Sequence, residues 1–191
     1  MKHTGPLKKL WHFIWYDDSF ASWLVNLLLA FILVKFIIYP GLGLLLGTSF
    51  PLVAVVSGSM EHNGLDFDAW WETQGDWYEE QGITKELFTE YAFTNGFNKG
   101  DIMFLKGVAP KSIKMGDVLV YETSLHSNPI IHRVVALEGE AFITKGDNNH
   151  REDTAVTAAQ VARTGKAVFR LPLLGWVKIW FVDLFNLGGV L

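Results

Sequence analysis

The sequence predicts a mainly β fold, in which an N-terminal transmembrane helix precedes a small antiparallel domain of the barrel-like or sandwich type. Three observations support this prediction. A nearly uncharged apolar run begins at residue 19, five short strand-like segments follow residue 100, and an acidic, aromatic stretch lies between them. With 50% hydrophobic and only 19% charged residues, the chain is too apolar to be disordered.

Composition also excludes several kinds of site and partner. The chain has no cysteine, which excludes disulfides, thiolate zinc sites and a cysteine nucleophile. Its net charge is −4 and it has no long basic run, so we expect no nucleic acid partner, because phosphate binding depends on clustered Lys and Arg. No cofactor is expected.

Residues 19–41 are predicted to be a transmembrane anchor that follows a cytoplasmic N-terminus, residues 1–18. Lys35 is the one formally charged residue between Ser19 and Met60, and near the end of a helix its side chain can reach the lipid headgroups. We expect the helix to cover about residues 19 to 39, because Pro40 and the glycine after it are the first strong helix breakers.

The residues before the anchor predict its orientation. By the positive-inside rule, Lys2, Lys8 and Lys9 place the N-terminus in the cytoplasm, so the rest of the chain is expected on the other side. Trp11 and Trp15 suit a membrane interface. A cleaved signal peptide is the alternative, but its apolar core is shorter, about 7 to 15 residues, and no small-x-small site closes this one.

The β domain is predicted to comprise residues 42–61 and 97–170. We expect a strand from Leu52 to Val56 to lead from the membrane into this domain. Apolar residues between Gly, Asp, Asn and Pro turn signals indicate five further strands, in "DIMFLKG", "DVLVYET", "PIIHRVVALEG", "EAFITKGD" and "GKAVFRLP".

Residues 62–96 differ from both flanks and are predicted to form an inserted, mostly helical segment. Eight acids against Lys85 give the insertion a net charge of −7, and aromatic residues recur throughout it. "ITKELFTEYAF" predicts a helix with Thr84 as its N-cap and with Leu87, Phe88 and Tyr91 on one face. We expect the insertion to pack on the β domain with its acids in water. The alternative is a lid that contacts a peptide, a partner or lipid.

Residues 171–191 are apolar, but Lys178 and Asp183 interrupt them. Trp176 and Trp180 mixed with these charges favour a helix in the membrane interface. A second transmembrane helix is the alternative.

A candidate nucleophile lies in "VVSGSME", where Ser57 and Ser59 flank a glycine directly after the expected first strand. A serine nucleophile needs an adjacent base and N–H donors for the oxyanion, and a neighbouring glycine lets the substrate backbone approach. Ser-Gly-Ser also occurs in ordinary turns, so the motif needs partners from elsewhere in the chain.

A candidate base lies within "NPIIHRVVALEG", where His132 shares a strand face with Ile130 and Val134. A histidine held in an apolar strand can act as a general base near neutral pH. The ordinary alternative is a buried core histidine. His126 and His150 are rivals, but they lie in polar stretches that hold a ring less firmly.

The third member of such a site is a carboxylate that orients the imidazole, and "ITKGDNNHRED" offers Asp147 and Asp153. The histidines and acids of this region lack the i, i+4 histidine spacing of a zinc protease, so no metal site is expected.

The motifs follow one order: a membrane helix, "SGSM", "GDIMFLKG" with "GDVLVY", "IIHRVV" and "TKGDNN". This order resembles the type I signal peptidases, which are membrane-anchored serine proteases, over roughly residues 20–60 and 97–180. Bacterial members carry lysine where this chain has His132, and the histidine is similar to the archaeal and endoplasmic-reticulum branch. The resemblance implies Ser59 as nucleophile, His132 as base and Asp153 as the acid, with Asp147 in support. It also implies that Ser57 lies near an oxyanion hole whose main donor is the Ser59 backbone N–H.

The implied activity is that of a serine endopeptidase that cleaves N-terminal signal peptides from secreted preproteins at the outer membrane surface. Expected partners are signal peptides, the lipid bilayer and the secretion translocon. The expected location is the cell membrane, or the endoplasmic-reticulum membrane in a eukaryote. The alternative is a membrane-tethered, non-catalytic protein that binds peptides or partners on the same scaffold.

The insertion departs from the family pattern. Members usually pass from "SGSMEP" to "GD" within a few residues, whereas here "SGSMEH" precedes the acidic segment. We expect this to affect substrate access rather than chemistry, so that a chain without residues 62–98 still hydrolyses a short soluble peptide.

Overall fold

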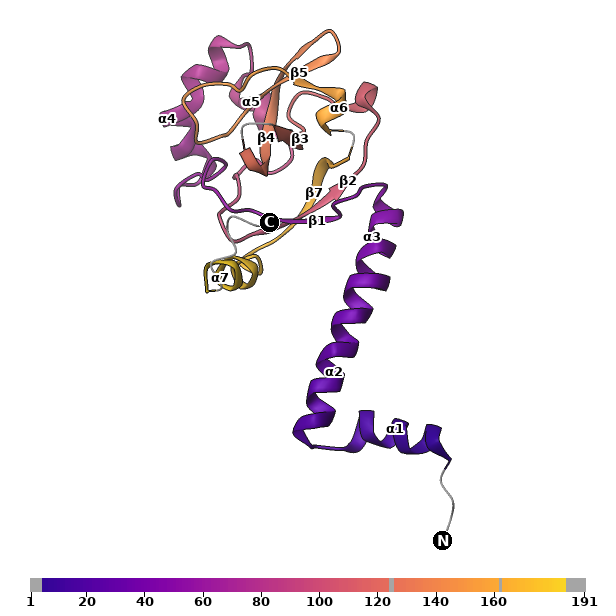
Figure 1. Ribbon diagram of the computed structural model, residues 1–191. Coiled ribbons are helices and arrows are strands. Elements are labelled where there is room, and N and C mark those ends of the chain that lie inside the picture. The colour runs from indigo at the N-terminus through magenta and orange to yellow at the C-terminus, as the bar shows by residue number, and fades with distance from the viewer. Residues whose placement is uncertain (1–4, 124–125, 162, 185–191) are drawn as a thin grey trace. The chain divides into compact units, whose positions relative to one another are not determined.

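The computed structural model describes residues 5–123, 126–161 and 163–184, and the chain forms two compact units, Met1–Leu45 and Leu46–Leu191 (Figure 1). The first unit contains α1 (Pro6–Tyr16), α2 (Phe20–Leu33), the π-helical η1 (Val34–Ile38) and the start of α3 (Tyr39–Leu46). Two side chains of α2 fasten it to α1. The Ser22 hydroxyl donates to the Phe13 carbonyl at 2.6 Å, and the Asn26 amide donates to the Ile14 carbonyl at 2.9 Å.

The helix does not end at Pro40, so the predicted boundary is wrong. Helical residues run without a break from Phe20 to Leu46, and within the described ranges this is the one helix long and apolar enough to cross a membrane. The physical reason lies in η1, where the Tyr39 N–H bonds the Val34 carbonyl five residues back. A wider turn of this kind accommodates the proline ring and its missing donor, which a regular α-helix would not.

The second unit is built on a seven-stranded antiparallel sheet in the order β1-β2-β7-β3-β4-β5-β6, which confirms the mainly β prediction (Figure 1). Each of the five predicted segments contains a strand, and two short strands complete the sheet. The strands are β1 (Leu52–Ala54), β2 (Ile102–Lys106), β3 (Val118–Thr123), β4 (His126–Glu138), β5 (Ala141–Lys145), β6 (Val156–Thr157) and β7 (Gly165–Leu171). Two short helical turns, η2 (Pro110–Ser112) and α6 (Ala158–Val161), connect strands.

Alternating side chains of the central strands fill two cores. Val118 and Val120 of β3 belong to the first core, and the intervening Leu119 belongs to the second. Ile130 and Val134 of β4 also pack in the second core, on the face that the sequence predicts for them. Ile131, which lies between them, packs in the first core, so β4 is covered on both faces next to His132.

The insertion folds into α4 (Phe67–Glu80) and α5 (Lys85–Thr89) and builds a third core. The Thr84 side chain accepts from the Leu87 N–H at 3.3 Å, so the predicted N-cap is confirmed. Leu87 itself is exposed, however, and of the three predicted residues only Phe88 and Tyr91 pack in the third core. The buried members of this core are Trp70, Trp71, Tyr78, Ile83, Phe88 and Val135 of β4.

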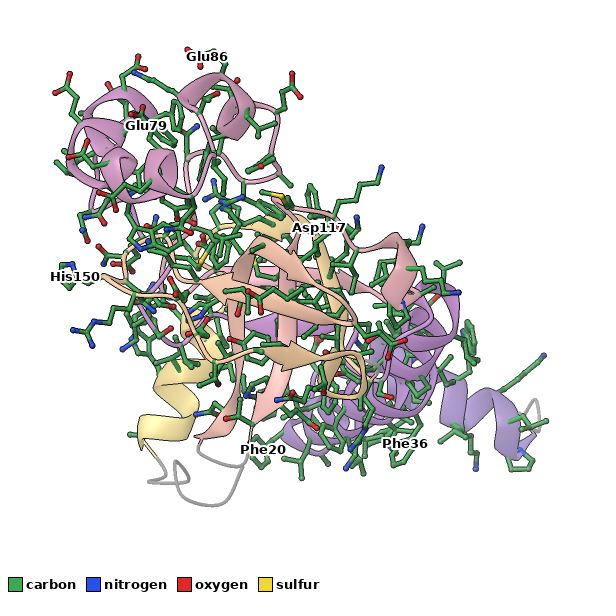
Figure 2. All side chains as sticks on the ribbon, turned by 90° about the horizontal axis from the view of Figure 1, so that it is seen from above. Phe20, Phe36, Glu79, Glu86, Asp117 and His150 are labelled. Atoms are coloured by element: carbon green, nitrogen blue, oxygen red, sulfur yellow. The ribbon has the colours of Figure 1, made fainter. Side chains whose placement is uncertain are left out.

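The acids of the insertion are all solvent-exposed. Figure 2 shows Glu86 at the outer edge of the insertion. The insertion therefore packs on the β domain with its acidic face in water, as predicted.

The described part of the C-terminal segment is α7 (Trp176–Leu184), which packs against β1. Ile179 is buried, while Val177, Trp180 and Leu184 are exposed. The interfacial location of residues 171–191 stays a prediction, and residues 185–191 lie outside the described ranges.

Candidate active site

The turn that carries the predicted nucleophile is held from both sides. The buried side chains of Val55 and Met60 bracket it in the first core. The Glu61 N–H donates to the Gly58 carbonyl at 3.1 Å, which closes a tight turn around Ser59. The Ser59 carbonyl accepts from the Asn148 N–H at 2.8 Å, so the turn is tied to the loop after β5.

His132 lies near the middle of β4, in register with Leu119 of β3, and only 6% of its surface is exposed. Its two ring nitrogens face different partners. Nε2 lies 2.9 Å from the Ser59 hydroxyl oxygen, and Nδ1 lies 2.6 Å from Oδ2 of Asp153. The structure thus brings together serine, histidine and aspartate in the order that proton transfer from the hydroxyl requires.

Asp153 is oriented by two further donors on the same oxygen. The Tyr121 hydroxyl donates to Oδ2 at 2.9 Å and the Thr144 hydroxyl donates at 2.8 Å. Burial raises the pKa of Asp153, but its hydrogen bond and charge interaction with His132 and the two hydroxyl donors outweigh burial and lower the pKa overall. The carboxylate therefore stays ionised next to the imidazole.

Asp147 occupies a different place from Asp153. Both of its oxygens accept from Arg133, at 2.9 Å from Nε and 2.8 Å from Nη2, and the carboxylate is completely buried. Burial raises its pKa, but the charge and hydrogen bonds of Arg133, together with the contact with His62, outweigh burial and lower the pKa overall. Of the two candidate acids, Asp153 contacts the imidazole of His132 and Asp147 contacts Arg133 instead.

The predicted oxyanion region is open to solvent. Ser57 is exposed, and its hydroxyl lies 3.2 Å from that of Ser59. The Ser59 backbone N–H donates to no residue that the structure describes, so it is free to meet a substrate oxygen.

The structure describes the side chain of one of the two rival histidines. His150 points outward into solvent (Figure 2). The side chain of His126 lies outside the described part of the structure. Within the described ranges, no group of three or more His, Cys, Asp or Glu side chains could hold a metal ion.

Comparison with known proteins identifies the family, although no protein-family model matches the chain. The signal peptidase complex catalytic subunit SEC11 of Komagataella phaffii is 31% identical over 180 residues, which cover 84% of each chain. This chain belongs to the family of signal peptidase complex catalytic subunits. SEC11 of Penicillium rubens is 32% identical over 155 residues, covering 75% of this chain and 69% of the relative. The human subunit SEC11C is 28% identical over 157 residues, which cover 76% of this chain and 65% of the relative.

Membership of the signal peptidase catalytic subunits confirms the resemblance that the order of motifs indicates. Sequence reasoning nevertheless missed five side chains around the site. Tyr121 and Thr144 are the donors to Asp153, and His62, Tyr78 and Arg133 surround Asp147. Strand alternation could have placed Tyr121 on the His132 face, since it lies two residues after Leu119, whereas nothing in the local pattern marks His62 or Tyr78.

Proposed function

We propose that this chain cleaves signal peptides from preproteins by acyl transfer to Ser59. The observation that carries the proposal is the contact between His132 and Ser59 at 2.9 Å, with Asp153 on the other side of the same ring at 2.6 Å. Membership of a family whose relatives are named signal peptidase catalytic subunits supports the choice of substrate.

In this mechanism His132 accepts the Ser59 proton at Nε2 while the hydroxyl oxygen attacks the scissile carbonyl. Asp153 accepts from Nδ1–H, which fixes the tautomer that leaves Nε2 free to accept the proton and stabilises the imidazolium that forms. His132 then returns the proton to the leaving amine, and water hydrolyses the acyl-enzyme with the same base.

The oxyanion of the tetrahedral intermediate is proposed to accept from the Ser59 backbone N–H, with the Ser57 hydroxyl as a second donor. The exposed position of Ser57 and the free Ser59 N–H support this assignment. An extended substrate with small residues at positions −1 and −3 would lie against the β domain as an added strand.

We place the domain on the outer surface of the membrane crossed by the helix from Phe20 to Leu46, with residues 1–18 in the cytoplasm. In a eukaryote this is the endoplasmic-reticulum membrane. Because the relatives are named as subunits of a signal peptidase complex, the other subunits of such a complex are proposed partners, with the translocon nearby.

The decisive experiment compares Ser59→Ala with Ser57→Ala in the full chain, reconstituted in liposomes with a model preprotein. Ser59→Ala should lower cleavage by at least about 10³-fold without changing the unfolding midpoint, because only the nucleophilic oxygen is lost. Ser57→Ala should retain partial activity. If the Ser59→Ala variant cleaves the preprotein as fast as wild type does, the proposal is overturned. If the wild-type chain binds the preprotein without cutting it, the non-catalytic alternative is favoured.

A further inference from the structure

The insertion reaches the interior of the domain through two polar side chains that both contact Asp147. The Tyr78 hydroxyl, at the end of α4, donates to Oδ1 at 3.2 Å, and His62 Nε2 lies 3.3 Å from Oδ2. With the two bonds from Arg133, four donors surround a carboxylate that has no exposure to water. Two of these four contacts come from the insertion.

Asp147 in turn belongs to the loop that holds the nucleophile turn. The next residue, Asn148, donates its backbone N–H to the Ser59 carbonyl at 2.8 Å and its side-chain amide to the Gly58 carbonyl at 3.1 Å. The Asp147 N–H itself points to the sulfur of Met60, at 3.4 Å. A shift of this carboxylate therefore moves the backbone on both sides of Ser59.

The C-terminal end of the insertion is bound by Arg133, the ion-pair partner of Asp147. Arg133, adjacent to His132 on β4, donates to the Ala92 carbonyl at 2.7 Å and to the Phe93 carbonyl at 2.9 Å. Its guanidinium also lies 4.6 Å from the centre of the Phe88 ring. Both ends of the insertion are thus attached to a buried ion pair that adjoins the proposed catalytic residues.

We infer that the insertion is a positioning element of the active site, in which His62 and Tyr78 hold Asp147 and thereby set the place of Ser59. This inference rests on the proposed function of Ser59. It does not fit the expectation that the insertion is dispensable for peptide hydrolysis, because removing it would leave two sides of a buried carboxylate without donors.

Both donors are prepared for this role. Burial, and then the charge of Asp147, raise the pKa of Tyr78, so its hydroxyl remains protonated and donates. The His62 ring stacks on Trp70 at 3.9 Å with an angle of 4° between the planes, which fixes the direction of Nε2.

The first test compares Tyr78→Phe with Tyr91→Phe, using the full chain in liposomes and a short soluble substrate peptide. Tyr91 is the matched control because its buried hydroxyl has no hydrogen-bond partner among the described residues of the same insertion. Tyr78→Phe should lower kcat about 10-fold and leave KM within about 2-fold, whereas Tyr91→Phe should leave both unchanged. Equal kcat in the two variants, or a change in KM alone, would overturn the inference.

The second test uses rescue by a donor. His62→Phe keeps an aromatic ring against Trp70 but removes the N–H, and His62→Gln restores an N–H without the ring. His62→Gln should recover most of the kcat that His62→Phe loses, even where it lowers the unfolding midpoint more. A lower kcat in His62→Gln than in His62→Phe would mean that activity depends on the stack with Trp70 and not on the contact with Asp147. This result would refute the positioning role of His62.

Ser59→Ala, measured in parallel, separates this inference from the proposed function. If Ser59→Ala still cleaves, the proposed function fails. If Ser59→Ala is inactive while Tyr78→Phe matches Tyr91→Phe, the proposed function stands and the positioning role fails.

Discussion

Two aspartates six residues apart have opposite surroundings. Asp153 is partly exposed, and three hydrogen-bond partners, one of them the imidazole, converge on a single oxygen. Asp147 is fully buried and binds Arg133 through both oxygens. Because the guanidinium already engages both oxygens of Asp147, Asp153 is the carboxylate suited to orient His132, which in the proposed mechanism changes charge during the reaction.

Asp153→Asn should lower kcat by about 10³ to 10⁴-fold, because an amide can hold the imidazole in the wrong tautomer and cannot stabilise its positive charge. Tyr121→Phe removes one donor to the same oxygen and should cost about 10-fold or less. Steady-state kinetics on a short peptide measure both. If the two losses were equal, the carboxylate would be serving a structural purpose and the triad assignment would be wrong.

Lys145 predicts a pH dependence of stability. Burial lowers its pKa to about 8, although the charges of Asp147 and Asp153 oppose this effect. In the unfolded chain the pKa is about 10.4, so between about pH 8 and pH 10.4 the unfolded state retains a proton that the folded state has released, and stability rises with pH.

The comparison is between wild type and Lys145→Met, by urea unfolding in detergent monitored by tryptophan fluorescence. The free energy of unfolding of wild type minus that of Lys145→Met should increase by at most about 3 kcal/mol between pH 7 and pH 10.4. Lys111→Met, at an exposed position, should show a constant difference. A constant difference for Lys145→Met as well would show that this ammonium is hydrated in the folded protein.

The core of the candidate site could be predicted because each residue stands in a short motif, and the motifs occur in a recognisable order. Ser59, His132 and Asp153 were proposed in this way, and the structure brings their side chains into contact. The surrounding residues were not, because Tyr121 and Thr144 are ordinary members of strands and acquire their roles only through sheet register. His62 and Tyr78 reach Asp147 across more than 60 positions of sequence, which no local pattern encodes.

At the level of elements, α4 shows how a helix can depend on a residue that normally weakens it. Gly75 lies in the buried face of α4, and a Cβ at this position would approach the Trp71 indole nitrogen to 2.5 Å. Trp71 is 6% exposed and packed in the third core, so its ring has little room to move.

Gly75→Ala should therefore destabilise the protein by about 1 to 3 kcal/mol, although the same change in an ordinary helix interior stabilises it by about 1 kcal/mol. Glu72→Ala, on the exposed face of α4, is the control and should change stability by less than about 0.5 kcal/mol. Urea unfolding measures both. Stabilisation by Gly75→Ala would mean that the indole has space that the structure does not show.

The strands were predictable because alternation and turn residues act locally, and the same holds for the Thr84 cap. The helix past Pro40 was not predictable in this way, since a π-turn at Val34–Ile38 removes the penalty that proline normally carries. The length of α5 was misjudged for a related reason. The spacing of Phe88 and Tyr91 suggests a helix that continues past Thr89. In the structure the helix ends there, and both side chains still pack in the third core.

At the scale of the whole molecule, the absence of cysteine makes the proposed topology directly measurable. Lys9→Cys in α1 and Glu80→Cys in α4 each introduce a single thiol at an exposed position. In sealed vesicles with the cytoplasmic face outward, a membrane-impermeant maleimide should label Lys9→Cys and spare Glu80→Cys until detergent is added. Labelling of both thiols in sealed vesicles would contradict a single crossing between them.

Strand β4 supplies a buried residue to each of the three cores: Ile131 to the first, Val134 to the second and Val135 to the third. Local opening of this strand would have to separate all three cores at once. Its amide protons should therefore exchange with deuterium only through global unfolding, while those of α1 and of the exposed loops exchange through small fluctuations. The imidazole of His132 would then be carried by a segment that opens only with the whole domain, which would return the proposed base to the same hydroxyl in every catalytic cycle.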